Sequence, residues 1–194
     1  MSAITRLTVI SSRLATDVQN VAVMKDLPAA LLAALVLQES GGRVSAWRFE
    51  PPYRYYWNCV ENEPFRAPTA AERAGEMAPE DFHVPAGWLV TRHTEWVGQA
   101  CSWGPLQVMG AVAREYGFRG DFTELCGAGL GLEYGALHLR KLRNRFLDRD
   151  GWEGVAAAYN AGSPRRTRAG GLWVNQEYVD GVHKLGGFEF EGIA

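Results

Sequence analysis

One carboxyl group in the sequence lies where a protein could use it as an acid. Glu39 follows the apolar run Leu-Leu-Ala-Ala-Leu-Val-Leu (31–37), which is predicted to be part of a buried helix. Desolvation by these side chains and the negative end of the helix dipole both raise the pKa of a carboxyl group there. A raised pKa keeps a glutamic acid protonated near neutral pH, as general acid catalysis requires. The alternative is a glutamate of the last helical turn that simply reaches solvent.

Three later segments hold further polar and aromatic side chains that could serve a binding site. They are Ser-Trp-Gly-Pro-Leu-Gln-Val-Met-Gly (102–110), Ala-Ala-Ala-Tyr-Asn-Ala-Gly (156–162) and Asn-Gln-Glu-Tyr-Val-Asp-Gly-Val (175–182). Each segment is a weak signal when it is taken alone.

Helices are predicted to position these segments. The helix before Glu39 is expected to have Asp26 as its N-cap and Gly41-Gly42 as its stop. The apolar spacing predicts an all-α chain, with further helices over 5–24, from Gly104 to Gly117, over about 128–148, over 152–160 and from about 175 to Gly186.

Residues 43–100 interrupt the helical pattern. Six of the nine prolines lie between residues 51 and 85, a density that a helix interior does not tolerate. The segment is also rich in aromatic residues, in a chain that has seven Trp, seven Tyr and eight Phe. Because long aromatic loops are often walls of binding sites, 43–100 is predicted to be an irregular insertion beside the functional site.

Taken in order after Gln-Glu-Ser-Gly-Gly (38–42), the three segments resemble the motifs of lysozyme-like lytic transglycosylases, particularly those encoded by bacteriophages. The resemblance covers 27–42 and 100–187, with Pro and Leu at 105 and 106 where Leu and Met are usual. In the insertion only Arg-Phe-Glu-Pro (48–51) looks like a feature of phage members. The resemblance implies a single lysozyme-like domain over 1–194.

It also implies a reaction. Such enzymes cut the β-1,4 bond between N-acetylmuramic acid and N-acetylglucosamine in peptidoglycan with one glutamate and no cofactor. Here Glu39 would protonate the leaving oxygen and then, as a carboxylate, help the muramic acid C6 hydroxyl attack its own C1, giving a 1,6-anhydro product. A hydrolase usually needs a second carboxylate. Residues 98–103 contain none, unlike goose-type lysozymes, but Glu50 and Glu95 remain candidates for that role.

Three polar side chains take binding roles by the same resemblance. Ser40 is expected to hydrogen-bond the catalytic carboxyl or a sugar. Gln107 is expected to meet a substrate amide or hydroxyl from the floor of the cleft, and Asn160 to bind sugar.

Three aromatic side chains are also implied. Tyr159 is expected to place its hydroxyl near Glu39 and orient it, and Tyr178 to point inward as well. For both, the alternative is a buried aromatic whose hydroxyl bonds to the backbone. Trp103 either stacks on a sugar face or anchors its turn.

Composition limits the classes of partner. With 194 residues, of which 47% are hydrophobic and 22% charged, the chain can bury a core of its own, and a monomer is expected. A net charge of −2 argues against nucleic acid as its main partner, and the absence of an 18-residue apolar run argues against a membrane span. Three cysteines without CxxC spacing argue against a disulfide framework but leave a single bridge open. Four histidines without HExxH spacing predict no metal site.

Two classes of function stay open. One is an enzyme that cleaves peptidoglycan glycan strands, and the other is a catalytically silent wall-binding virion protein that keeps the fold. The set Glu39, Gln107, Tyr159 and Asn160 favours the enzyme. No secretion signal is evident in the first 25 residues, so we expect delivery from the host cytoplasm to the cell wall through a holin, or on the virion during entry.

Overall fold

Short strands accompany the helices that the sequence predicts. The computed structural model describes residues 1–74, 77–168 and 171–190 of the chain. The protein is mostly helical, with 54% helix and 8% strand, so the all-α prediction is confirmed in outline. Within the described residues, the strands form one three-stranded and one two-stranded antiparallel sheet, which were not predicted.

Two helices replace the single one predicted over 5–24. These are α1 (Ala3–Ile10) and α2 (Ser12–Lys25). Ser11 separates them in an extended conformation, and its hydroxyl accepts a hydrogen bond from the Leu14 amide. Because this bond caps the first turn of α2, the chain starts a new helix at this point instead of continuing the first.

The helix α3 (Ala29–Ser40) is central, as its apolar sequence predicts. Residues 31–36 are fully buried, and the helix packs against α1 and α2. Gly41 ends it in the left-handed conformation (φ 62°), also as predicted. Asp26 is not its N-cap but the left-handed C-cap of α2 (φ 54°). Glu39 therefore lies in the last turn of a buried helix.

A small sheet and a tight turn take the place of the first half of the helix predicted from Gly104 to Gly117. The elements are β1 (Trp47–Phe49), β4 (Cys101–Trp103), β5 (Val108–Met109) and the short helix α6 (Gly110–Glu115), with strand order β1-β4-β5. Two left-handed residues, Gly104 (φ 73°) and Gln107 (φ 48°), form the turn between β4 and β5. A side chain at Gly104 would collide with the Leu125 carbonyl oxygen, so this turn requires glycine.

The long helix α7 (Ala128–Ala161) joins the two helices predicted over 128–148 and 152–160. The 3₁₀ helix η1 (Phe122–Cys126) precedes it. Gly151 interrupts α7 with non-helical angles (φ 64°, ψ −176°), so the chain kinks between the two predicted segments. The first part packs against α2 and η1.

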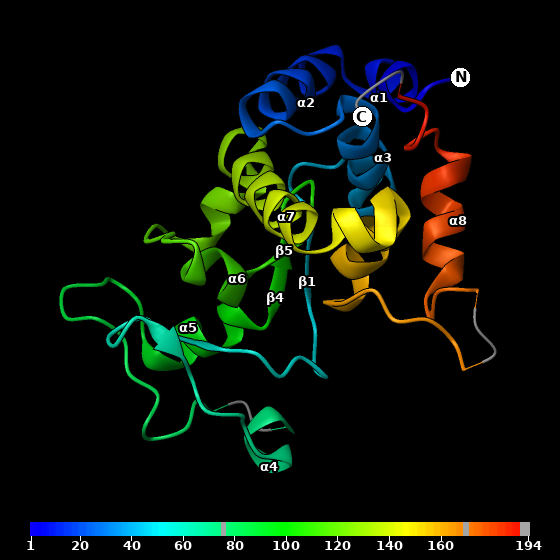
Figure 1. Ribbon diagram of the computed structural model, residues 1–194. Helices are drawn as coiled ribbons and strands as arrows, with labels where there is room; N and C mark the ends of the chain where they lie inside the picture. Colours follow the sequence, from blue (N-terminus) through cyan, green and yellow to red (C-terminus); the bar gives the residue numbers. More distant parts are fainter. Residues whose placement is uncertain (75–76, 169–170, 191–194) are drawn as a thin grey trace.

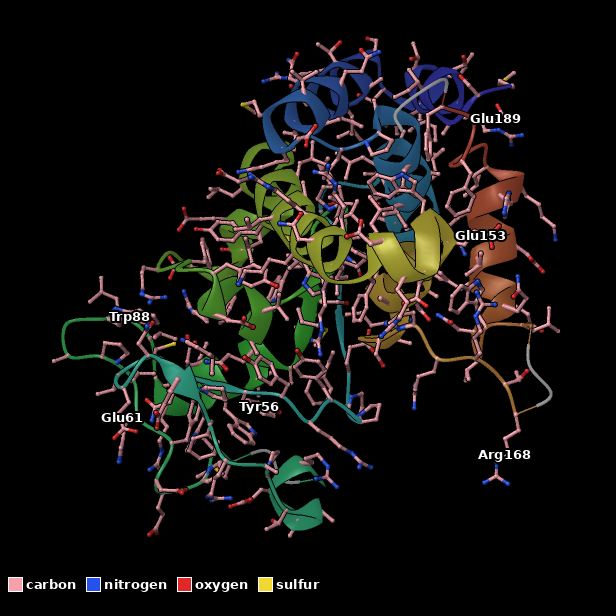
Figure 2. The ribbon with its side chains drawn as sticks, in the orientation of Figure 1. Tyr56, Glu61, Trp88, Glu153, Arg168 and Glu189 are labelled. Carbon is pink, nitrogen blue, oxygen red and sulfur yellow. The ribbon has the colours of Figure 1, made fainter. Side chains whose placement is uncertain are left out.

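The last helix, α8 (Gln176–Lys184), lies beside α7 and contacts α3 (Figure 1). Glu153 reaches it from α7 (Figure 2), with 2.7 Å between Glu153 Oε1 and His183 Nε2. This packing brings the first turn of α8 to the end of α3.

The described part of 43–100 holds only short elements, as expected of an irregular insertion. Besides β1 these are β2 (Trp57–Asn58), β3 (Glu63–Pro64), α4 (Ala70–Ala74) and α5 (Arg92–Gln99). Most of the insertion forms a lobe beside the helices (Figure 1). Its core is aromatic: Tyr56, inside the lobe in Figure 2, stacks on Trp96 with 3.8 Å between ring centroids, and Phe82 contacts both rings edge-on.

The cysteines contribute thiols and no cross-link to this fold. Cys59, Cys101 and Cys126 are all free, and the first two are buried. None of the helices described here is both long and apolar enough to cross a lipid bilayer.

Candidate active site

A cleft with a volume of about 880 Å³ opens at the last turn of α3. Its walls come from α3, from β1 and the residues after it, from the β4–β5 turn, from the end of α7 and from the start of α8. Six residues singled out from the sequence line it: Glu39, Glu50, Gln107, Tyr159, Asn160 and Tyr178. Three others do not line it: Ser40, Glu95 and Trp103.

Glu39 combines a half-buried position with access to the cleft. Burial raises the pKa of its carboxyl group above 4.5, the value for an unperturbed glutamate. A hydrogen bond from Tyr178 and the charge of Arg48 offset part of this rise, while the charge of Glu50 adds to it. Desolvation dominates, so Glu39 holds its proton at a pH at which an exposed glutamate has lost it.

Tyr178, and not Tyr159, orients Glu39. The Tyr178 hydroxyl donates to Glu39 Oε1 at 2.5 Å, across from α8. The Tyr159 hydroxyl donates instead to the Leu106 carbonyl oxygen at 2.7 Å. The role expected of Tyr159 thus passes to Tyr178, because the backbone of the β4–β5 turn already engages the Tyr159 hydroxyl.

Ser40 faces the interior and does not reach the cleft. Its side chain is buried, and its hydroxyl donates to the Val36 carbonyl oxygen one helical turn earlier, at 2.9 Å. Serine hydroxyls in helices often form this bond to their own backbone. The Ser40 hydroxyl therefore does not bond to the Glu39 carboxyl group, and it does not face the cleft in which a sugar would lie.

Gln107 fixes the turn that forms the cleft floor. Its Nε2 donates to the carbonyl oxygens of Ala46 (3.1 Å) and Gly104 (2.8 Å), and its Oε1 accepts from Ser102 Oγ (2.9 Å). Because both amide hydrogens are used within the protein, Gln107 offers a ligand only the remaining lone pair of Oε1.

Asn160 lies exposed at the end of α7, on the cleft wall. Its Oδ1 accepts a hydrogen bond from Asn175 Nδ2 at 2.9 Å. Asn175 also donates to the Ala157 carbonyl oxygen at 3.0 Å, which ties the start of α8 to α7. This pair fixes the direction of the Asn160 amide towards a ligand.

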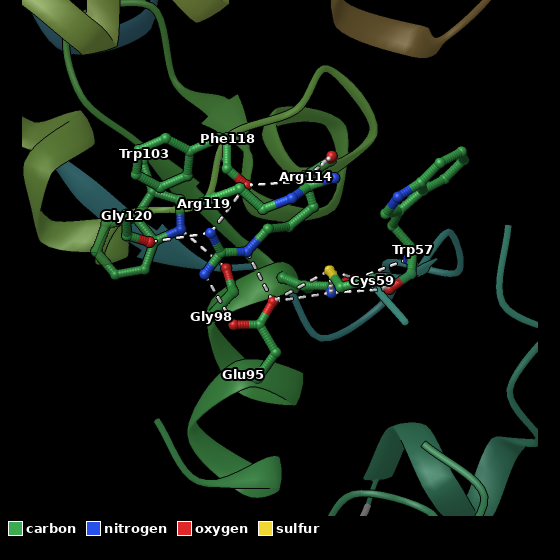
Figure 3. Close-up of polar contacts among 10 residues, drawn as sticks. Trp57, Cys59, Glu95, Gly98, Trp103, Arg114, Phe118, Arg119 and Gly120 are labelled. Atoms are coloured by element: carbon green, nitrogen blue, oxygen red, sulfur yellow. Dashed lines mark hydrogen bonds and ion pairs between the residues drawn. The ribbon is translucent and has the colours of Figure 1, made fainter. Parts of the chain in front are cut away.

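Trp103 anchors its turn, and of the two roles expected of it this is the one that its surroundings favour. Its side chain is 8% exposed, and its Nε1 donates to the Gly98 carbonyl oxygen at 2.9 Å (Figure 3). Phe122 and Trp47 cover its two faces, with 5.6 Å and 5.8 Å between ring centroids. No face of Trp103 is left for a sugar.

Glu95 is too deeply buried to act on a substrate. It is 0% exposed, and both of its carboxylate oxygens accept hydrogen bonds from Arg114, at 2.8 Å and 2.9 Å (Figure 3). Gln99 donates to the same carboxylate at 3.0 Å. Glu95 is therefore a structural ion-pair partner, and its candidacy as a second catalytic carboxylate does not hold.

Glu50, by contrast, shares the cleft with Glu39. Its Oε1 lies 2.6 Å from Arg48 NH2, and Ser102 Oγ, whose one hydrogen is donated to Gln107, lies 3.4 Å away. Its charge is close enough to raise the pKa of Glu39. Glu50 is therefore the second carboxylate that the cleft can offer.

Arg48 also lines this cleft, although its sequence context predicted no role there. Arg48 lies on β1 and Glu50 follows the strand directly, so a two-residue spacing places both on one face. That spacing was visible in the sequence, but nothing in it indicated that 47–49 forms a strand.

No family model, curated protein or solved structure matches this chain. Within the residues that the structure describes, no group of three His, Cys, Asp or Glu side chains gathers as metal ligands would.

Replacing Tyr178 by Phe is expected to raise the pKa of Glu39 further. The tyrosine hydroxyl stabilises the carboxylate, so its loss favours the protonated form. NMR titration of the Glu39 carboxyl group measures this change directly. Tyr159→Phe is the matched control, because its hydroxyl bonds to Leu106 and its removal should leave the Glu39 titration in place. An unchanged pKa in the Tyr178 variant would contradict the assignment.

Proposed function

We propose that this protein is a lytic transglycosylase with a lysozyme-like fold, which cleaves the β-1,4 bond between N-acetylmuramic acid and N-acetylglucosamine in peptidoglycan. The observation that carries the proposal is Glu39, a carboxyl group with a raised pKa at the end of a buried helix, open to a large cleft. The order of the sequence motifs around that cleft supports the choice of substrate.

The first step is proton donation. With its pKa raised by burial, Glu39 carries the proton that the leaving glycosidic oxygen needs. The hydrogen bond from Tyr178 holds one carboxyl oxygen, so the other is directed to the substrate. As the C1–O4 bond breaks, the proton moves to the leaving hydroxyl and positive charge develops at C1 of the muramic acid.

In the second step Glu39 acts as a base. Its carboxylate removes the proton of the C6 hydroxyl on the same muramic acid, and that oxygen bonds to C1 to close the 1,6-anhydro ring. The proton returns to Glu39, and no water is consumed. The Tyr178 hydroxyl stabilises the intermediate carboxylate, which is the form that burial disfavours.

A hydrolase is the second candidate, and the position of Glu50 favours it. A retaining or inverting glycosidase uses a second carboxylate across the bond that it cleaves. Glu50 lies in the same cleft as Glu39, paired with Arg48. In that reaction Glu50 would activate water or stabilise C1, and the product would carry a reducing end.

Mass spectrometry of the soluble products from purified peptidoglycan tests the proposal. Muropeptides that end in 1,6-anhydro-muramic acid, lighter than the reducing-end forms by one water, are expected. Reducing-end products would establish the hydrolase instead. An absence of soluble products, with binding to the wall retained, would leave the silent wall-binding protein.

Glu50→Gln distinguishes the two chemistries. For a transglycosylase the variant is expected to keep cleaving and to yield the same anhydro ends. Because the charge of Glu50 raises the pKa of Glu39, its removal should lower that pKa and move the alkaline limb of the pH–rate profile to lower pH. Loss of cleavage by about 100-fold or more would identify Glu50 as catalytic and support the hydrolase.

A further inference from the structure

We propose that Trp47 is the platform on which the cleft stacks one sugar ring of its substrate. This inference rests on the proposed function, since it assumes that a glycan occupies the cleft. Trp47 lines the cleft together with Glu39, yet its side chain is 61% exposed. An indole group that protrudes this far loses a large unfavourable contact with water when a ligand covers it.

The strand pairing fixes the orientation of Trp47. In the β1–β4 register Trp47 lies directly opposite Trp103, so the two side chains share one face of the sheet. Their rings stack with 5.8 Å between centroids and 20° between planes. Trp103 is itself held by the hydrogen bond from its Nε1 to the Gly98 carbonyl oxygen. The inner face of Trp47 is therefore covered.

The stack continues into the protein interior. Trp103 lies parallel to Phe122, with 5.6 Å between centroids and 8° between planes. Arg114 lies over the Phe122 ring, with its guanidinium carbon 4.1 Å from the ring centroid, and is fixed by Glu95. Three aromatic rings in a row thus end on a buried ion pair (Figure 3 shows Trp103 and Arg114). A platform supported in this way loses little conformational freedom on binding.

A pyranose ring fits this surface by its chemistry. In β-1,4-linked N-acetylglucosamine the ring substituents are equatorial, so each face of the ring presents axial C–H groups to an aromatic plane. The indole offers a flat apolar face for that contact. Polar groups for the sugar hydroxyl and amide groups lie in the same cleft, on Asn160 and Arg43 among others.

A second hollow on the surface is also lined by Trp47 and is an alternative location for the stacked sugar. It has a volume of about 680 Å³, and its surface is mainly apolar, with Leu89 and Val97 among the residues that line it. We assign the stacked sugar to the cleft rather than to this groove, because a glycan needs the hydrogen-bonding groups that the groove largely lacks. Leu89 lines the groove but not the cleft, so replacing it distinguishes binding in the groove from binding in the cleft.

Calorimetric titration with a soluble chitin tetramer, made of β-1,4-linked N-acetylglucosamine, tests the assignment. All variants carry Glu39→Gln, so that no cleavage occurs during the measurement. Adding Trp47→Ala is expected to weaken binding about tenfold, and Trp47→Phe to weaken it less. Adding Leu89→Ala to Glu39→Gln should leave the affinity for the tetramer the same as that of the Glu39→Gln parent. Since Trp47 is exposed, its replacement leaves the core packing in place, and thermal unfolding of each variant verifies this.

Several results would overturn the inference. These are equal binding by the parent and the Trp47→Ala variant, a loss of affinity in Leu89→Ala as large as that in Trp47→Ala, and no binding of the chitin tetramer by the parent. Failure of the proposed function has a different signature. In that case the wild-type protein releases no products with 1,6-anhydro-muramic acid ends from peptidoglycan, whatever the binding titrations show.

Discussion

Replacing Glu39 by Gln is expected to lower the rate of peptidoglycan cleavage by a factor of about 10²–10⁴. Gln keeps the size of the side chain and can accept the hydrogen bond from Tyr178, but its amide group is not acidic enough to protonate a leaving oxygen. Release of soluble muropeptides from purified cell walls measures the effect. Glu177→Gln is a suitable control, because this glutamate lies in the first turn of α8 but does not line the cleft. Unchanged cleavage by Glu39→Gln would refute the catalytic assignment.

The same variant should be more stable than the parent at neutral pH. The folded protein holds the pKa of Glu39 above 4.5, so the unfolded chain releases this proton first as the pH rises. The corresponding stability is fully present below about pH 4.5 and is lost as the pH rises towards the folded-state pKa. Gln is not subject to this loss. The difference in Tm between variant and parent should be small in acid and should grow above that pH, whereas a less stable variant at neutral pH would argue against a desolvated Glu39.

The position of Glu39 was predictable because local features determine it. A run that is apolar on every side must be a buried helix, and Gly41 ends it where a left-handed residue is required. Both features act within a few residues of Glu39. The raised pKa then follows mainly from burial, which is the largest of the influences on Glu39.

The partners of Glu39 depend on tertiary packing and could not be derived in the same way. Tyr159 and Tyr178 lie on different helices, and which hydroxyl reaches Glu39 depends on how α7 and α8 pack after the kink at Gly151. Motif resemblance places both tyrosines near the site, but it assigns the orienting role to Tyr159, whereas the hydroxyl that reaches Glu39 is that of Tyr178. Ser40 shows a different limit, since its bond to the backbone competes with any role in the cleft.

The prediction of a helix from Gly104 to Gly117 was wrong in its first half because of the backbone conformation there. The apolar spacing there fits a helix, but Gly104 and Gln107 adopt left-handed angles that close a turn between two short strands. Gly104 could have indicated this, whereas Gln107 is a residue that rarely adopts such a conformation. The hydrogen bonds from its side chain to Ala46 and Gly104 hold it there, and these depend on the position of the insertion.

Replacing Glu95 by Ala is expected to destabilise the protein by about 3–5 kcal/mol, the largest effect on stability that we predict. The glutamate and Arg114 are both buried and share two short hydrogen bonds. Without Glu95 the guanidinium group stays buried with its charge uncompensated. Urea unfolding followed by circular dichroism measures the loss. Glu133→Ala removes the exposed partner of Lys25 and serves as the control, with little change expected.

The expected loss of stability is large because Arg114 connects several elements of the fold. Beyond Glu95, its guanidinium group donates to the carbonyl oxygens of Phe118 and Gly120 and lies over the Phe122 ring. One buried cation therefore ties α5, in the insertion, to the loop after α6 and to η1. If the free energy of unfolding of the Glu95→Ala variant lies within about 1 kcal/mol of that of the parent, water reaches the Glu95–Arg114 pair in solution. The insertion would then be held by its remaining contacts, among them the β1–β4 pairing, and the support beneath Trp47 would be weaker than the ring stacking implies.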